Sequence, residues 1–305
     1  MGGGPRPSQK PLEVIWLIPS SPCFPMSLTH PSEVKALLNE LGIHPNRKMG
    51  QNFLIDSNIL RILLRTADLQ ARDSVLEVGP GLGVLTEWLA RWAGRVVAVE
   101  KDRRLVAFLR EKFAEKDNVE IVEGDILDQD LEALLKGGVN KVIANLPYAI
   151  SSRLLFSLAD APRSPAQITV TVQKEVAERI VSPPCSSDYG LLSVIIQLKY
   201  CAAISKEVSP TCFLPPPDVK SAILNMERRQ APCEPRDRAI LHRLVKTAFT
   251  HRRKQLLGTL AKVDGLGESR AGEILSAIGI PPRARPETVP PDQWVQLADA
   301  ALPTN

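Results

Sequence analysis

SVLEVGPGLGVLTEWLARW, residues 74–92, joins a short apolar segment, a glycine-rich turn and an amphipathic segment in direct succession. Val75–Val78 is short and rich in branched aliphatic residues, which predicts a β-strand. Val84–Trp92 spaces its apolar residues as one face of a helix does. The glycines between them allow the sharp turn that joins a strand to the following helix. These residues therefore predict one unit of a parallel α/β sheet.

The same alternation of short strands and amphipathic helices continues along the chain. The other expected strands are Val96–Val99, Val119–Val122, Val142–Ala144 and Ile168–Val172. The expected helices are Arg104–Phe113, Lys174–Val181, one capped by Ser32 that runs to Leu41, and one that follows Asp56. Alternating strands and helices favour a parallel sheet with helices on both faces. We therefore expect an α/β protein with a Rossmann-like, doubly wound sheet.

The pattern becomes wholly helical after the expected strand Ala222–Met226. The expected helices there are Arg238–Phe249, Arg252–Val263, Ser269–Ile278 and Gln293–Ala301. We therefore expect a smaller all-helical C-terminal domain beside the sheet domain. The predicted divisions are an extension at residues 1–26, a sheet domain at residues 27–229 and a helical domain at residues 230–305.

The composition limits the class of protein and the kind of binding partner that the chain is expected to have. The 305 residues are 44% hydrophobic and 24% charged, and the net charge is +4. These values are typical of a soluble globular protein with a weak preference for a polyanionic partner. Basic residues concentrate between Glu227 and Lys254, where nine Arg and Lys stand against three acidic residues. The five cysteines form no C-x-x-C pair and have no His at ligand spacing, so we expect reduced thiols, a cytoplasmic protein and no metal site.

The first 25 residues differ in character from the rest. They are rich in Gly and Pro, and the apolar run Val14–Ile18 is too short for a signal-peptide core or a membrane span. We expect either a mobile tail or an upstream extension with translation beginning at Met26. No later segment is apolar enough to cross a bilayer, so no membrane association is expected.

Polar residues follow the expected strands at the edge where parallel sheets bind ligands. The glycine spacing is G-x-G-x-G, whereas dinucleotide sites prefer G-x-G-x-x-G, and Glu77 would crowd a pyrophosphate but suits ammonium and sulfonium charge. Glu100 ends the second strand, where an acid can accept hydrogen bonds from ribose hydroxyls. Asp125 follows the third strand and can accept a hydrogen bond from an adenine amino group. With Asn145 at the next strand end, these residues predict a crevice that fits S-adenosylmethionine better than a nicotinamide.

The tetrapeptide Asn145-Leu146-Pro147-Tyr148 directly follows the strand-like segment Lys141–Ala144. Such a turn offers a side-chain acceptor, an outward backbone carbonyl and a flat ring. An exocyclic amino group of a nucleobase needs two acceptors and a stacking surface if it is to be methylated. Taken alone, the tetrapeptide is nearly as compatible with a proline turn closed by a half-buried tyrosine.

Six motifs are spaced along the chain: KMGQNFL at 48–54, EVGPGLG at 77–83, NLPY at 145–148, VQKEVAER at 172–179, FLPPPDVKS at 213–221 and AFTHRRK at 248–254. Together they resemble the small-subunit ribosomal RNA adenine dimethyltransferases of the kasugamycin-sensitivity type, from about Ser32 to Trp294. The resemblance implies S-adenosylmethionine as cofactor. The implied product is a pair of adjacent N6,N6-dimethyladenosines in a hairpin loop near the 3′ end of small-subunit rRNA.

The resemblance implies roles for residues at the cofactor, and the chemistry of adenine methylation predicts roles for the others. Those expected at the cofactor are Gln51, Asn52, Leu54, Gly79, Gly81, Glu100, Asp125 and Asn145. Those expected to carry out methyl transfer are Asn145, Leu146, Pro147 and Tyr148. Those expected to hold the RNA are Tyr148 and Phe213, which would stack on the base, and Arg252, Arg253 and Lys254, which would contact phosphates. Phe213 is equally expected as a core residue that anchors the proline loop, and the basic residues are also compatible with structural ion pairs. Without the other motifs, Gln51 and Asn52 would be expected to fasten an N-terminal loop to the core by amide hydrogen bonds.

Three positions in or near two of the motifs depart from the pattern of that family. The family usually continues the turn with Asn and then Ile-Ser-[Ser/Thr]-Pro, whereas this chain has Ala149 and Arg153 at the Asn and Pro positions. Asp218 stands where a basic residue is more usual, which weakens the expectation of a phosphate contact in the proline loop.

Alternative functions stay open at the level of sequence. An erythromycin-resistance type methyltransferase, which modifies one adenine of large-subunit rRNA, shares the fold and cofactor, although the Ala248–Lys254 motif and the proline loop favour the small-subunit type. A ribosome-assembly factor would bind an immature small subunit and use methylation only as a release signal. A nicotinamide oxidoreductase is disfavoured by the glycine spacing. For the favoured function we expect a monomer whose partner is rRNA within a pre-ribosomal particle.

Overall fold

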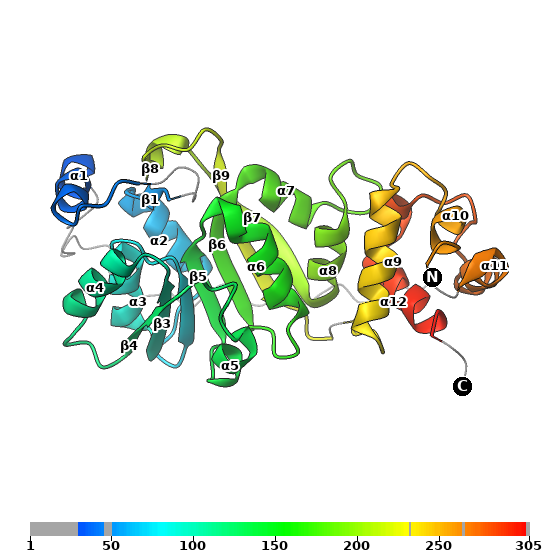
Figure 1. Cartoon of the computed structure of the whole chain (residues 1–305), viewed down its shortest axis with the longest axis horizontal. Helices are drawn as coiled ribbons and strands as arrows, with labels where there is room; N and C mark the ends of the chain where they lie inside the picture. The colour runs from blue at the N-terminus through cyan, green and yellow to red at the C-terminus, as the bar shows by residue number, and fades with distance from the viewer. Residues whose placement is uncertain (1–29, 46–50, 232, 264–265, 303–305) are drawn as a thin grey trace, which may run out of the picture.

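A seven-stranded sheet forms the centre of the protein, in the order β4-β3-β2-β5-β6-β9-β7 (Figure 1). The computed structural model describes residues 30–45, 51–231, 233–263 and 266–302. The strands of the sheet are β2 (Ser74–Val78), β3 (Arg95–Glu100), β4 (Val119–Glu123), β5 (Lys141–Asn145), β6 (Gln167–Gln173), β7 (Tyr200–Val208) and β9 (Ser221–Arg228). Strands β2 to β6 are parallel, and β9 runs antiparallel to both of its neighbours. The expected doubly wound α/β fold is confirmed, with an antiparallel strand added to the parallel sheet.

The strands and helices of the sheet domain follow the apolar pattern of the sequence. The helices are α1 (Pro31–Glu40), α2 (Ser57–Thr66), α3 (Val84–Trp92), α4 (Arg103–Lys112), α5 (Leu131–Lys136), α6 (Tyr148–Asp160), α7 (Lys174–Val181) and α8 (Leu191–Lys199). On β5, Val142 and Ala144 pack with α6 and α7, whereas Ile143 packs with α2 and α3 on the opposite face. Successive strand residues point to opposite faces, so helices on both sides bury the central strands β2, β5 and β6, whereas the edge strands β4 and β7 stay partly exposed.

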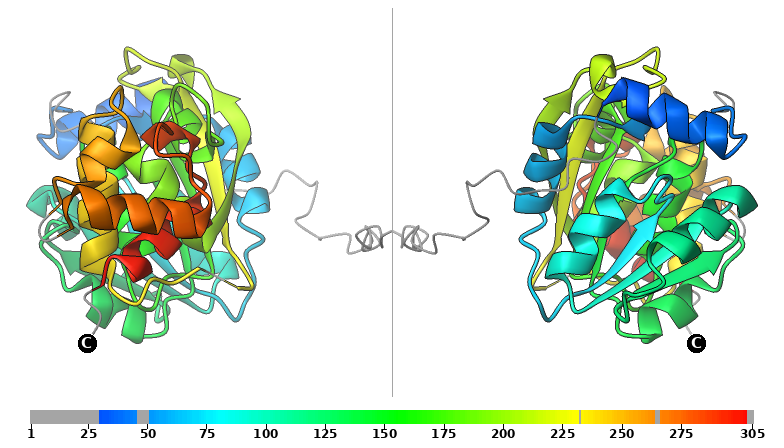
Figure 2. Two further views of the ribbon diagram at one scale, coloured as in Figure 1. Left: turned by 90° about the vertical axis from the view of Figure 1, so that its right-hand side faces the viewer. Right: turned by 90° about the vertical axis from the view of Figure 1, so that its left-hand side faces the viewer.

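A second apolar core joins the C-terminal helices to α8. These helices are α9 (Arg238–Thr250), α10 (Leu256–Leu260), α11 (Gly267–Ile278) and α12 (Pro291–Ala300). Their core includes Leu244 and Trp294 together with Tyr189, Val194 and Leu198 from the chain around α8. Figure 2 shows α9–α12, in yellow to red, gathered at one end of the molecule. The division between residues 229 and 230 stays a prediction, because this core also takes side chains from before it.

Several elements were not expected from the sequence. Helix α6 begins at Tyr148 with Pro147 as its N-cap, so the predicted catalytic turn is also a helix start. Helix α8 is apolar on most of its surface, which hides the helical period. Strand β7 and the small ribbon of β1 (Phe53–Leu54) and β8 (Phe213–Leu214) depend on pairing with distant segments.

Two local predictions are wrong. Ser32 is not the cap of α1, because His30 occupies that position and Pro31 is the first helical residue, where a missing amide hydrogen costs nothing. The expected helix Arg252–Val263 is helical only over Leu256–Leu260. The chain after α9 forms a turn instead, in which the Lys254 amide donates to the His251 carbonyl.

Residues 1–26, Met26 as a start and the first three residues of the KMGQNFL motif lie outside the described residues. Within the described ranges, none of the helices combines the length and the apolar character needed to span a membrane.

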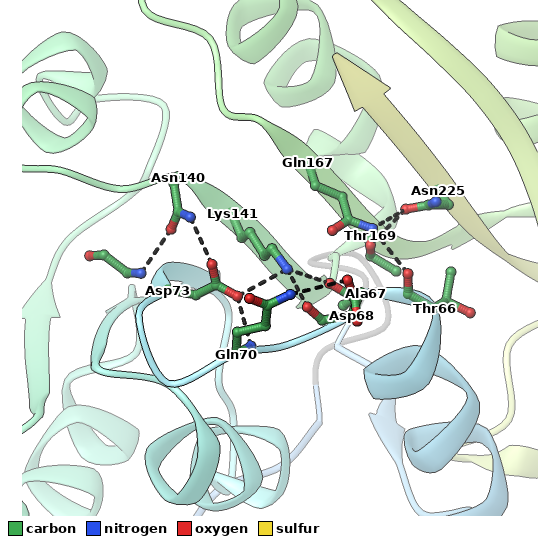
Figure 3. Close-up of polar contacts among 11 residues, drawn as sticks. Thr66, Ala67, Asp68, Gln70, Asp73, Asn140, Lys141, Gln167, Thr169 and Asn225 are labelled. Atoms are coloured by element: carbon green, nitrogen blue, oxygen red, sulfur yellow. Dashed lines mark hydrogen bonds and ion pairs between the residues drawn. The ribbon is translucent and has the colours of Figure 1, made fainter. Parts of the chain in front are cut away.

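A buried polar cluster ties the loop before β2 to the amino end of β5 (Figure 3). The Lys141 ammonium pairs with Asp73 at 2.9 Å and donates to the carbonyls of Ala67 and Asp68. The other Asp73 oxygen accepts a hydrogen bond from Asn140. Each charged atom has partners, as a buried ion pair requires if it is not to destabilise the fold. This cluster fixes the edge of the sheet opposite to the predicted crevice.

Asp73→Asn is expected to lower the free energy of unfolding by about 3–5 kcal/mol, because the Lys141 charge would stay buried without its counter-ion. Urea unfolding measures this change. Glu132→Gln is the control, because it removes the exposed pair of Glu132 with Lys136 and should cost less than about 1 kcal/mol. Equal effects of the two substitutions would contradict the role given to Lys141.

Candidate active site

A cavity of about 310 Å³ opens where the parallel strands end at their carboxyl edge. Its lining includes residues from the loop before β1, the glycine loop, and the ends of β3, β4 and β5. All eight residues predicted to bind the cofactor line it: Gln51, Asn52, Leu54, Gly79, Gly81, Glu100, Asp125 and Asn145. The sequence-predicted crevice therefore exists as one continuous space.

The glycine loop adopts backbone angles that side chains disfavour. Gly79, Gly81 and Gly83 have φ values of 69°, 59° and 73°, in the left-handed region. A Cβ on Gly83 would lie 2.8 Å from a Leu109 side-chain carbon, so the third glycine also permits close packing of α4. The Gly79 amide donates to the Val99 carbonyl, which fixes the loop to the end of β3. The loop therefore presents its backbone to the cavity in a fixed position.

Glu77 places a carboxyl group at the inner wall of the cavity. It is buried, and its Oε2 atom has no hydrogen-bond partner among the described residues. Burial raises the pKa of this carboxyl from 4.5 to about 8 against the lowering effect of the nearby Thr86 hydroxyl, and Glu100 adds to the rise. An unpartnered buried acceptor of this kind fits a ligand that brings a positive charge or a donor.

Glu100 connects the glycine loop to the chain after β3. Its carboxylate accepts from the Gly81 amide at 3.2 Å and from the amides of Lys101 and Asp102. Burial raises the pKa of Glu100 against the lowering effect of these hydrogen bonds. The side chain is thereby held at the cavity wall, where an acceptor for ribose hydroxyls was predicted.

Asp125 lines the cavity just after β4, near Glu100. One carboxylate oxygen accepts from the Leu127 amide, and the other pairs with the Lys101 ammonium at 2.8 Å. The hydrogen bond from Lys101 is the main reason that the pKa of Asp125 is lowered. Lys101 was not predicted as a site residue, although its position next to Glu100 could have drawn attention to it.

Asn145 is the last residue of β5, and the nitrogen and oxygen of its side-chain amide differ in their hydrogen bonding. Its Nδ2 atom donates to the Asn52 carbonyl at 2.9 Å. Its Oδ1 atom is buried and has no hydrogen-bond partner among the described residues. The contact with Asn52 orients the amide and leaves its oxygen as an acceptor without a partner among the described residues.

The rest of the tetrapeptide is placed by the sheet and by α6. The Leu146 amide donates to the Thr171 carbonyl of β6, and Pro147 caps α6. Tyr148 is half-buried and lines the cavity, and its hydroxyl shares a hydrogen bond with Ser221 on β9. Ser221 was not predicted as a site residue, although it is the last residue of the FLPPPDVKS motif.

Phe213 does not line the cavity. Its side chain is 2% exposed and packs in the core with residues of α2 and α3. It belongs to β8, where it pairs with Leu54 of β1. This position favours the core interpretation of Phe213 over stacking on a base.

The three basic residues after α9 differ from one another. The Arg252 guanidinium donates to the carbonyls of Ser186 and Ser187 and lies 3.9 Å from Glu287. These contacts match the structural interpretation of Arg252. Arg253 and Lys254 are exposed on the turn.

The cavity fits the cofactor that the sequence predicts. It combines a carboxyl group with an unpartnered oxygen, a carboxylate held for hydroxyl donors and an acid placed for an amino group. S-adenosylmethionine carries an ammonium, ribose hydroxyls and an adenine amino group, which are the matching donors. Among the described residues, no group of three or more His, Cys, Asp or Glu side chains gathers as metal ligands.

Glu77→Gln is expected to change the pH dependence of stability in the cofactor-free protein. Because the pKa of Glu77 rises from 4.5 to about 8 on folding, the native state binds more protons than the unfolded state in this interval. The wild type should therefore lose stability as pH rises through the interval, and Glu77→Gln should lose less. Urea unfolding from pH 5 to pH 8.5 measures the difference, and parallel profiles would contradict the burial of a neutral Glu77 carboxyl.

Comparison with known proteins agrees with this geometry. The family described as ribosomal RNA adenine dimethylase matches residues 43–301. The chain is 38% identical over 282 residues to the ribosomal RNA small subunit methyltransferase A of Moorella thermoacetica, which covers 89% of this chain and 98% of that protein.

Two solved structures share the architecture. A dimethyladenosine transferase from Plasmodium falciparum has a TM-score of 0.71 at 22% identity, covers 80% of this chain and 95% of its own, and shows the common fold. The 23S rRNA methyltransferase ErmE has a TM-score of 0.60 at 28% identity and covers 82% of this chain and 99% of its own. Since the family match extends over most of the sequence, the chain belongs to the ribosomal RNA adenine dimethylase family.

Proposed function

We propose that the protein transfers methyl groups to N6 of two adjacent adenosines in the 3′-terminal hairpin loop of small-subunit (16S) rRNA. The product is N6,N6-dimethyladenosine. Membership of the family makes the protein an S-adenosylmethionine-dependent rRNA adenine dimethyltransferase. The observation that carries the assignment of the site is the buried, unpartnered Oδ1 atom of Asn145 at the cavity.

The cofactor would lie along the carboxyl edge of β2 to β5. Glu77 would face its ammonium group, Glu100 its ribose and Asp125 its adenine, with Gln51, Asn52 and Leu54 covering it from the β1 side. When bound, S-adenosylmethionine supplies a methyl group on a positively charged sulfonium. The glycine loop, with Gly79 and Gly81, keeps side chains out of the space that the cofactor needs.

The chain's own contribution to chemistry is the pair of acceptors in the tetrapeptide. Adenine's amino nitrogen is a poor nucleophile because its lone pair is delocalised into the ring. The Asn145 side-chain oxygen and the Leu146 backbone carbonyl would accept its two hydrogens and draw the nitrogen toward tetrahedral geometry. Because positive charge develops on that nitrogen, fixed acceptors stabilise the transition state more than the ground state.

Tyr148 would hold the extruded base by stacking against it. Its ring lines the cavity next to Asn145, and a base stacked on an aromatic ring gains on the order of 1–3 kcal/mol. Pro147 is the N-cap of α6. The two acceptors and the ring therefore all belong to four consecutive residues. This arrangement supplies proximity as well as orientation.

The RNA contact that we propose outside the cavity is the turn after α9. Arg253 and Lys254 are exposed there and can contact phosphates, whereas Arg252 holds the loop at Ser186 and Ser187. We further propose that the protein acts in the cytoplasm, as a monomer, on rRNA within a pre-ribosomal particle. The helical domain at residues 230–305 would provide this contact.

The relatives favour the small subunit over the large one. The protein from Moorella thermoacetica, named a small-subunit methyltransferase, is 38% identical, whereas ErmE, named a 23S rRNA methyltransferase, is 28% identical. The experiment that tests the substrate is incubation with labelled methyl donor and unmethylated small or large subunits, followed by mapping of the modified nucleotides. Methylation of the large subunit alone would refute the proposal.

Asn145→Ala is expected to lower the rate of methyl transfer by at least about 100-fold, because it removes an acceptor that acts on the developing charge. RNA binding should persist, and single-turnover rates with unmethylated small subunits measure the loss. Asn118→Ala is the control: it removes an amide that donates to Ala90 and Ala93, and the rate should stay near that of the wild type. A rate within a few-fold of wild type for Asn145→Ala would refute the assigned role.

Substitutions after α9 are expected to separate RNA binding from stability. Arg253→Gln and Lys254→Gln should each reduce the slope of log affinity against log salt by about one, as loss of a phosphate contact does. Arg252→Gln should instead lower the melting temperature, because it releases the carbonyls of Ser186 and Ser187. Binding titrations at several salt concentrations and thermal unfolding distinguish these effects, and an unchanged slope would remove the turn from the RNA interface.

A further inference from the structure

The tetrapeptide Asn145–Tyr148 is held at both ends by side-chain hydrogen bonds. At its first residue, the Asn145 amide donates to the Asn52 carbonyl at 2.9 Å. At its last residue, the Tyr148 hydroxyl lies 2.5 Å from the Ser221 hydroxyl oxygen. Both contacts join residues far apart in sequence, so the turn depends on tertiary structure for its orientation.

The segments that contain Asn52 and Ser221 are joined to each other. Asn52 directly precedes β1, and Ser221 follows β8 by a short proline-rich loop. Strands β1 and β8 pair, with Phe53 opposite Leu214 and Leu54 opposite Phe213. The ribbon formed by these two strands therefore connects the segment that orients the amide with the segment that contacts the ring.

Ser221 is placed rigidly. It is the first residue of β9, it is 0% exposed, and it pairs with Gln173 of β6 and Val208 of β7. The adjacent Lys220 carbonyl accepts from the Lys174 amide at the start of α7. A hydroxyl on such a backbone gives Tyr148 a fixed partner.

The hydrogen bond controls one degree of freedom of the tyrosine. The hydroxyl lies on the axis through Cβ and Cγ, so its contact with Ser221 fixes the direction in which the ring points. Rotation about that axis is limited separately by the packing of the half-buried ring. A stacking surface must stay in place while the base lies beside the methyl donor, because small displacements cost much of the rate.

We propose that Ser221 is a positioning residue for methyl transfer, which acts by fixing the ring of Tyr148 against the substrate adenine. The inference rests on the proposed function, since it needs a base stacked on Tyr148. Ser221 itself touches neither the base nor the cofactor. Its effect passes through the tyrosine hydroxyl, so it disappears when that hydroxyl is absent.

The test is a double-mutant cycle with Ser221→Ala and Tyr148→Phe. Each single variant keeps the aromatic ring but breaks the hydrogen bond and leaves one buried hydroxyl without its partner. Each should lower the single-turnover rate about three- to tenfold, with affinity for S-adenosylmethionine unchanged. The double variant removes both hydroxyls and should be no slower than either single variant.

A matched control separates positioning from general stability. Ser193 lies in α8, away from the cavity, and is also 0% exposed. Its hydroxyl donates to the Arg179 carbonyl and accepts from the Gly190 amide. Ser193→Ala should lower the melting temperature without lowering the rate at a temperature where all variants are folded. A rate loss in Ser193→Ala equal to that in Ser221→Ala would overturn the proposal.

The remaining outcomes are also decisive. If Tyr148→Phe is slow but Ser221→Ala has the wild-type rate, the tyrosine hydroxyl acts directly and Ser221 has no positioning role. If the losses of the single variants multiply in the double variant, the two hydroxyls act independently. Failure of the wild type to methylate small subunits would refute the proposed function instead, and this result is known before any variant is compared.

Discussion

The parallel pairing of β2 to β5 is the constraint on which the site depends. Parallel strands of similar length end at one edge, so the residues that follow each of them meet there although they are separated by many residues in sequence. The glycine loop, Glu100, Asp125 and Asn145 each occupy such a position. A parallel sheet with another strand order would keep these residues at the same edge but would separate them.

Buried polar side chains at the two ends of the sheet differ in whether their atoms have hydrogen-bond partners. At the amino end, Lys141 and Asp73 satisfy each other and the surrounding carbonyls, which stabilises the loop before β2. At the carboxyl end, Glu77 and Asn145 keep acceptor atoms without partners among the described residues. Unsatisfied acceptors cost stability when buried, and a site that binds donors recovers that cost on binding.

The turn Asn145–Tyr148 shows how the fold converts a short motif into a site. Its backbone is fixed by β6 through Leu146 and by α6 through Pro147. Its side chains are oriented from outside the motif, by Asn52 and Ser221. In the proposed function the motif supplies the groups that would act on an amino nitrogen, and the surrounding ribbon and strand decide where those groups point.

The sequence by itself determined the α/β alternation, the order of the strand-end residues and the tetrapeptide, because these are local patterns of period and turn chemistry. Residues 84–92 and 174–181 form the predicted helices, and every predicted cofactor residue lines the cavity. Only the tertiary structure decided the core position of Phe213, the loop contacts of Arg252, the lysine that pairs with Asp125 and the hydroxyl of Ser221 that meets Tyr148. These features depend on contacts between segments that are distant in sequence, and local periodicity does not predict such contacts. Helix α8 escaped prediction for a related reason, since its residues are buried in both cores rather than along one amphipathic face. Strand β7 is a largely exposed edge strand whose place in the sheet depends on its pairing with β9.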